Sequence, residues 1–181
     1  MTELIEFDPA DSVGAGAFGP PGGRTFLVQA VRGGDVLSVL VEKEQVRLLA
    51  NEALQFLARL ADDQPDPMGE AWGLDGSVRE AVPLFRARML GIGYDPRRSL
   101  VVIELREWPD DVVPAPEGPG DANPAGDPGL PEPRVARIFA SRAQVRAMAT
   151  HALEVVDAGR PPCPLCEMPI DPDGHWCPRW N

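Results

Sequence analysis

The pattern of apolar and polar residues along the chain predicts two β-hairpins. Runs rich in apolar and β-branched residues occupy 25–31, 36–42, 85–93 and 99–107. Gly33 and Gly34 lie between the first two runs, and a Gly-Gly turn between apolar runs is typical of a hairpin. Shorter apolar runs at 4–8 and 134–140 predict two further strands.

A period of about 3.6 residues marks two helices, at 43–62 and 142–158. Their apolar stripes are Val46, Leu49, Ala50, Ala53, Leu57 and Leu60 in the first, and Val145, Met148, Ala149, Ala152 and Val156 in the second. Ser141 is the expected N-cap of the second helix. The turn-forming stretches 11–23 and 63–83 are expected to be surface loops. Together these elements predict an α+β fold, with two helices packed on one face of an antiparallel sheet.

The two predicted helices share a sequence pattern. Gln45-Val46-Arg47-x-x-Ala50-x-x-Ala53-Leu54 matches Gln144-Val145-Arg146-x-x-Ala149-x-x-Ala152-Leu153. The interpretation we favour is a duplicated unit of strands followed by a helix. Coincidence stays open, because Ala, Leu and Arg are common in this chain and amphipathic helices resemble one another.

The composition changes sharply before the last predicted strand. Residues 109–133 contain eight prolines, four glycines and six acids, with no lysine or arginine. Such a segment buries too little apolar surface to offset the entropy lost on ordering, so we expect it to be disordered. The predicted organisation is therefore an α+β domain at 1–158, carrying this insertion, followed by a small unit at 159–181.

Charge narrows the functional classes. The 181 residues have a formal net charge of −11, whereas nucleic-acid-binding domains concentrate Lys and Arg on one face. Nucleic acid is therefore a disfavoured partner. No signal peptide and no membrane-length apolar window is visible, so we expect a cytoplasmic protein without membrane association. In reducing cytosol, clustered cysteines are more often metal ligands or redox groups than disulfides.

All three cysteines lie near the end of the chain, in the spacing Cys163-x2-Cys166-x8-His175-x-Cys177. Three thiolates and one imidazole are a usual ligand set for a closed, tetrahedral zinc site. The single residue between His175 and Cys177 is unusual, but Gly174 provides a bend. We therefore predict a structural Zn²⁺ site that orders residues 159–181, which we call the knuckle.

Other roles for these cysteines are disfavoured. A redox Cys163-x-x-Cys166 pair would need a following helix to lower the thiol pKa, and Pro169 and Pro172 intervene. A catalytic zinc would need an open coordination position, whereas four candidate ligands fill the sphere. Free thiols near a frayed C-terminus remain an alternative.

The segment GRPPCPLCEMPIDPDGHWCPRWN resembles the C-terminal signature of an actinobacterial family of conserved proteins of unknown function. GGRTFLVQA and VLVEKEQV in the N-terminal half are similar to that family as well. The resemblance implies a bacterial, cytoplasmic protein with a zinc site, and no established reaction. Glu167 departs from the pattern, because many zinc knuckles have glycine at this position.

Several arginines are candidate contacts for an anion or a partner. Arg24 precedes the first hairpin, and Arg86, Arg88 and Arg106 share polar strand faces with Glu104. A solvated, charge-paired sheet face is the simpler interpretation.

Trp176, Arg179 and Trp180 flank the predicted zinc ligands. They either cover the metal or form a contact surface, since tryptophan and arginine are enriched at interfaces. The glycines at 14, 16, 19, 22 and 23 lack the Gly-Lys-Ser/Thr of a phosphate loop. His151 is expected to be a surface or half-buried helix residue, because no nucleophile pairs with it.

Two main functional hypotheses follow. In the first, the protein is a non-enzymatic interaction or regulatory protein whose knuckle contacts a cytosolic protein partner. In the second, it is an enzyme or anion-binding domain that uses an arginine-lined cleft on the sheet. A third, nucleic-acid binding through the knuckle, ranks last, because residues 134–181 contain six arginines against five acids. No acid–base or nucleophile–base pair stands out in the sequence, so we favour the first. The partner and the oligomeric state are not specified by the sequence.

Overall fold

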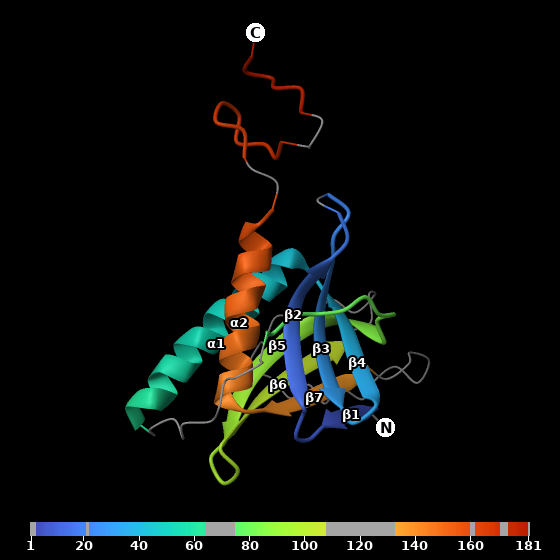
Figure 1. Ribbon diagram of the computed structural model, residues 1–181, viewed down its shortest axis with the longest axis vertical. Helices are drawn as coiled ribbons and strands as arrows, with labels where there is room; N and C mark the ends of the chain where they lie inside the picture. The colour runs from blue at the N-terminus through green and yellow to red at the C-terminus, as the bar shows by residue number, and fades with distance from the viewer. Residues whose placement is uncertain are drawn as a thin grey trace, which may run out of the picture.

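A computed structural model describes residues 3–20, 22–63, 75–107, 133–159, 162–170 and 174–180. These residues form one seven-stranded sheet and two α-helices (Figure 1). The strands are β1 (Leu4–Phe7), β2 (Ser12–Phe18), β3 (Thr25–Arg32), β4 (Asp35–Val41), β5 (Phe85–Asp95), β6 (Leu100–Glu107) and β7 (Val135–Ala140). The helices are α1 (Lys43–Asp63) and α2 (Arg142–Asp157). The predicted α+β class is confirmed.

The sheet is mixed rather than antiparallel, which corrects the prediction. Its order is β1-β7-β6-β5-β4-β3-β2, and the β1–β7 and β4–β5 pairs are parallel. The β3–β4 and β5–β6 hairpins are present as predicted. Parallel neighbours need a long crossover connection, and α1 lies in the connection from β4 to β5. Local sequence pattern identified the four strands of these parallel pairs but contained no information about the pairing itself.

Strand β2 was wrongly predicted to be part of a loop at 11–23. Ser12–Phe18 pairs with β3 along its whole length, although glycine is a poor strand residue. A Cβ on Gly14 would lie 2.0 Å from the carbonyl oxygen of Ser77, and one on Gly16 would lie 3.5 Å from the His151 ring. The glycines of β2 therefore let other segments approach its backbone closely.

Strands β1 and β2 are consecutive in the chain but occupy opposite edges of the sheet. The residues between these two strands form hydrogen bonds with strands near both edges of the sheet. Ala10 N–H donates to the Phe139 carbonyl of β7 and Asp11 N–H to the Val31 carbonyl of β3, each at 2.8 Å. These two bonds bring the two edges of the sheet together at one end.

The two helices lie where their apolar periodicity predicts. Ser141 is the N-cap of α2, and its hydroxyl accepts a hydrogen bond from the backbone N–H of Gln144. The predicted stripes are buried except for Leu60, which is half-buried. Helix α1 packs against α2, β5 and β3, and α2 packs against α1, β2 and β6. Packing of both helices on one face stays a prediction.

Residues 75–84 include part of the surface loop predicted at 63–83, and they cross the sheet without forming a helix or strand. Ala15 N–H of β2 donates to the Gly76 carbonyl at 3.1 Å. The Gln29 side chain of β3 accepts from Arg79 N–H at 2.8 Å and donates to the Arg79 carbonyl at 2.6 Å. The rest of that predicted loop, and the predicted insertion up to residue 132, lie outside the described residues.

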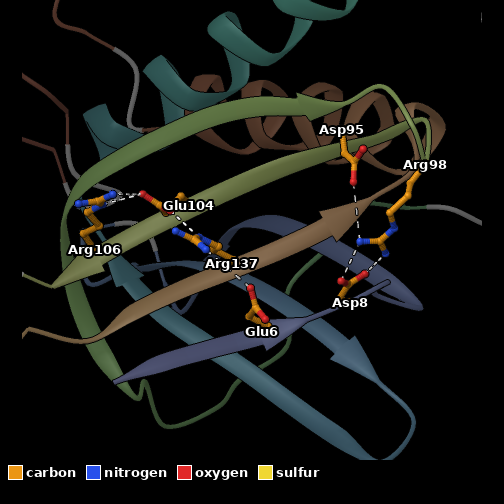
Figure 2. Close-up of polar contacts among 7 residues, drawn as sticks. All are labelled: Glu6, Asp8, Asp95, Arg98, Glu104, Arg106 and Arg137. Atoms are coloured by element: carbon orange, nitrogen blue, oxygen red, sulfur yellow. Dashed lines mark hydrogen bonds and ion pairs between the residues drawn. The ribbon is translucent and has the colours of Figure 1, made fainter. Parts of the chain in front are cut away.

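The exposed face of β1, β7 and β6 carries a row of paired charges (Figure 2). Glu104 accepts from Arg106 at 2.6 Å and from Arg137 at 2.7 Å, and Arg137 lies 3.8 Å from Glu6. The interpretation of Arg106 and Glu104 as members of a charge-paired sheet face is confirmed. Close by, Arg98 pairs with Asp8.

Candidate metal centre

The knuckle begins directly after α2, and hydrogen bonds shape its first turn. Cys163 N–H donates to the Met168 carbonyl and Glu167 N–H donates to the Cys163 carbonyl, each at 2.8 Å. A β-bridge between Pro162 and Pro169 closes the base of this turn. The turn places the side chains of Cys163 and Cys166 together, as the Cys-x-x-Cys spacing predicts.

Two residues of the knuckle have a left-handed backbone. Glu167 has φ +63° and Gly174 has φ +93°. Glycine adopts this region without strain, whereas a residue with a Cβ does so at a cost. The conformation explains why glycine suits position 167, where the sequence departs from the usual pattern. The bend predicted at Gly174 stays a prediction, because residues 171–173 lie outside the described residues.

The structure brings the four predicted ligands together. The ligand atoms of Cys163, Cys166, His175 and Cys177 all lie within 4.8 Å of one another, which is close enough to bind one metal ion. The sulfurs of Cys163 and Cys177 are 3.9 Å apart, and Cys166 Sγ is 3.3 Å from His175 Nε2. The sulfur–sulfur distance far exceeds a disulfide bond of about 2.05 Å, and all three cysteines are free.

The surroundings of the thiols favour a thiolate at one of them. The backbone N–H groups of Cys166 and Leu165 point to Cys163 and lower the pKa of its thiol to about 7. Burial raises the pKa of Cys166, and the neighbouring Cys163 thiolate adds to that rise. Cys163 and Cys177 are buried, while Cys166 and His175 are half-buried. A divalent cation among these groups would favour the deprotonated thiols, because metals bind thiolates.

Two of the three predicted contact residues of the knuckle are exposed to solvent. Trp176 is 78% exposed and Trp180 is 79% exposed, so neither ring is covered by the described residues. Arg179 folds back instead, and its guanidinium donates to the Leu165 carbonyl at 2.9 Å. This bond ties the last turn of the knuckle to the Cys-x-x-Cys turn.

The predicted arginine cluster is only partly assembled. Arg24 and Arg86 line one open depression together with Lys43, whereas Arg88 does not. Arg24 donates to the carbonyls of Val155 and Ala158 at the end of α2, at 3.0 and 3.1 Å. Arg86 forms an ion pair with Glu42, beside the first turn of α1. Arg24 thus acts in the fold as a C-terminal cap for α2, a role that sequence reasoning missed.

Sequence reasoning also missed a polar group beside His151. Ser77 donates to Asp75 through its N–H at 3.0 Å and its hydroxyl at 2.9 Å, and these bonds lower the pKa of Asp75. Asp75 and half-buried His151 line the same open depression beside α2. The Asp75-Gly76-Ser77 sequence predicts a tight turn, but nothing in it indicates contact with α2.

None of the helices in the described ranges has a long enough apolar stretch to cross a membrane. Comparison with curated proteins and with solved structures found no match. Comparison with protein families matches residues 5–177 to the family described as "Protein of unknown function (DUF3090)". Because this match spans most of the chain and includes the four candidate ligands, the chain belongs to the DUF3090 family.

Proposed function

We propose that this is a non-enzymatic interaction protein of the bacterial cytoplasm, whose knuckle is ordered by a structural zinc ion and binds a protein partner. The observation that carries the proposal is the convergence of Cys163, Cys166, His175 and Cys177 on a space of the size of one ion. Three thiolates and an imidazole are ligands that zinc favours.

The separations of the ligand atoms support zinc. With Zn–S near 2.3 Å and Zn–N near 2.0–2.1 Å, tetrahedral geometry puts two sulfurs roughly 3.8 Å apart and sulfur and nitrogen roughly 3.6 Å apart. The corresponding distances here are 3.9 Å for Cys163–Cys177 and 3.3 Å for Cys166–His175. Small movements of the side chains would complete the coordination sphere.

A structural role is favoured over a catalytic one, because four protein ligands leave no position for water or substrate. The knuckle also needs such an ion. Most of its described side chains are exposed or half-buried, so burial contributes little to its order. Zinc binding supplies on the order of 10–16 kcal/mol in small zinc-binding peptides. An ordered knuckle would present Trp176 and Trp180 to a partner.

Metal analysis tests the zinc site. The purified protein is expected to hold about one zinc per chain, and Cys166→Ser and His175→Asn are each expected to lose it. His151→Asn is the matched control, because His151 lies on α2 outside the ligand group. Zinc retained by His175→Asn, or lost from His151→Asn, would contradict the assignment of ligands.

Affinity capture from the native cytosol tests the interaction. The intact protein and Cys166→Ser are compared, with His151→Asn as the folded control. We expect at least one partner that binds the intact protein and the control but not Cys166→Ser. Identical partner lists for all three would remove the knuckle from the proposed function.

An anion-binding role is the second candidate, and the shared depression of Arg24, Lys43 and Arg86 favours it. It has less support, because Arg24 already caps α2 and Arg86 already pairs with Glu42. Titration with inorganic phosphate while backbone amide NMR shifts are followed would test it. Saturable shifts confined to this depression, lost in Lys43→Gln, would favour it over protein binding.

A further inference from the structure

Trp176 and Trp180 are exposed in the knuckle and indicate the chemistry of its partner. This inference rests on the proposed function. Ten large apolar side chains are exposed among the described residues, and four of them lie in the knuckle: Leu165, Met168, Trp176 and Trp180. The knuckle contributes 17 of the described residues. Its share of exposed apolar side chains is therefore far larger than its length, which is typical of a binding surface.

Inside the fold, aromatic rings are contacted by arginine. Arg98 lies over Phe139 and Arg142 over Tyr94, each 5.0 Å from the ring centroid, and Arg134 lies over Phe85 at 5.4 Å. Tryptophan is the best ring for such a cation–π contact. In the part of the chain that the structure describes, neither the Trp176 nor the Trp180 ring has one. Among the described aromatic residues, the two tryptophans, whose rings bind cations most strongly, are exposed to solvent.

The knuckle has a negative net charge in its sequence. Residues 159–181 contain two arginines and three acids, and three thiolates around one divalent ion add a further charge of −1. Arg179 is already bonded to the Leu165 carbonyl. The whole chain has a net charge of −11. A negative surface attracts cations and repels nucleic acids and anionic membranes.

We infer that the knuckle binds a basic peptide segment of a partner protein, with an arginine side chain stacked on Trp176 or Trp180. The exposed Leu165 and Met168 side chains provide apolar surface for the methylene groups of basic side chains. Arginine suits this site better than lysine, because its planar guanidinium stacks on aromatic faces and is weakly hydrated. Opposite charges attract the basic segment to the knuckle. The tryptophan rings then favour arginine among its cationic side chains.

A peptide titration with the full-length, zinc-loaded protein tests this inference. The probe is a fluorescent Gly/Ser peptide that contains two arginines, and its matched control replaces both by citrulline, which has the same shape without the charge. At physiological salt the citrulline peptide is expected to bind at least about tenfold more weakly. Equal binding of the two peptides would overturn the inference, as would tighter binding of single-stranded oligocytidine.

Two double variants distinguish the contribution of the tryptophan rings to peptide binding from that of the overall negative charge. The double variant Trp176→Leu/Trp180→Leu keeps every charge, and we expect it to bind the arginine peptide about tenfold more weakly than the parent. Trp176→Phe/Trp180→Phe keeps aromatic faces and should bind with intermediate affinity. Zinc content is measured in both variants to show that the knuckle is intact. Unchanged binding by the leucine variant would place the peptide elsewhere on the acidic surface and overturn the inference.

Failure of this inference can be distinguished from failure of the proposed function. If a cytosolic partner is lost with Cys166→Ser but retained by the leucine variant, the knuckle binds its partner without the rings. That result would overturn the arginine inference and leave the proposed function standing. If the partner is retained by both variants, the proposed function fails as well.

Discussion

Glu167 occupies a backbone conformation that glycine adopts more easily. At φ +63°, an L-residue loses on the order of 1 kcal/mol relative to glycine. The same turn carries N–H groups that point to the Cys163 sulfur. Under the proposed function zinc orders this turn, and zinc binding then includes the cost of the Glu167 conformation.

Replacing this residue should therefore strengthen the metal site. We expect Glu167→Gly to hold zinc roughly fivefold more tightly than the parent in competition with a chelator. Glu167→Ala is the matched control, because it removes the same carboxylate but keeps the Cβ. Equal gains in the two variants would show that charge, not backbone strain, is responsible.

Glu107 links its ionisation to the stability of the sheet. Arg134 donates to both of its carboxylate oxygens at 2.7 Å, and these bonds lower the pKa of Glu107. A carboxylate with a lowered folded-state pKa stabilises the fold above its unfolded-state pKa. That contribution is lost as the pH falls through the folded-state value.

Acid should therefore destabilise the parent more than a variant that lacks this carboxylate. We expect the free energy of unfolding in urea to fall less between pH 5 and pH 3 in Glu107→Gln, by up to about 1 kcal/mol because the pair is partly exposed. Glu80→Gln, at an exposed residue outside the described ion pairs, is the control. A pH dependence in Glu107→Gln equal to that of the parent would contradict the linkage.

Three successive strands lead into each helix, β2–β4 into α1 and β5–β7 into α2, with β1 as an additional first strand. A glutamine at the start of each helix makes matching contacts. Gln45 Oε1 accepts from Glu42 N–H, and Gln144 Oε1 accepts from Ser141 N–H, both at 2.8 Å. Each amide also donates to two successive carbonyls near the first strand of the other half. Duplication would produce this repetition, although it stays a prediction.

The close approach of β2, residues 75–77 and α2 depends on glycine. A Cβ on Gly14 would meet the backbone oxygens of Ser77 and Gly76 at 2.0 and 2.8 Å. Backbone atoms cannot move aside as the end of a flexible side chain can. The fold must shift at this point to accept any other residue.

We therefore expect Gly14→Ala to lower the free energy of unfolding by about 2–3 kcal/mol. Gly34→Ala is the control, because no heavy atom lies within 4 Å of its added Cβ. Urea unfolding followed by far-UV circular dichroism measures both. If the two variants are equally stable, residues 75–77 do not pack against β2 as described.

The elements that sequence reasoning recovered are those set by local pattern. Alternation and turn residues located both hairpins, and the helical stripes and Ser141 located both helices. The missing strand, β2, is glycine-rich because of its neighbours, which lie at distant positions in the sequence. The parallel pairs and the path of residues 75–84 likewise depend on long-range packing.

At the scale of the whole molecule, the separation of the knuckle from the α+β domain stays a prediction. Among the residues that the structure describes, no hydrogen bond joins the knuckle to the sheet or the helices. The knuckle lies beyond the C-terminal end of α2, away from the sheet (Figure 1). Arg24, which caps that end of α2, belongs to the α+β domain and not to the metal site.

Removal of zinc should therefore leave the α+β domain folded. With excess chelator we expect the amide NMR signals of the knuckle to collapse. The free energy of unfolding of the domain in urea should change by less than about 0.5 kcal/mol, as for independent sites. Loss of the domain's cooperative transition on chelation would show that the metal stabilises the whole molecule.

The candidate site was predictable in part for a physical reason. The type and the spacing of the ligands can be read from the sequence, because one short segment that begins at Cys163 supplies all four of them. The use of Arg24 as a helix cap and the exposure of Trp176 and Trp180 depend on how distant residues pack. Those features became visible only in three dimensions.

X-ray absorption at the zinc edge of the purified protein tests the central claim most directly. The account predicts about one zinc per chain, with three sulfur ligands near 2.3 Å and one nitrogen ligand near 2.0–2.1 Å. In His175→Asn the nitrogen shell should disappear or the zinc should be lost, while His151→Asn should give the parent spectrum. A protein purified without metal, or a zinc ion bound mainly by oxygen, would contradict the account.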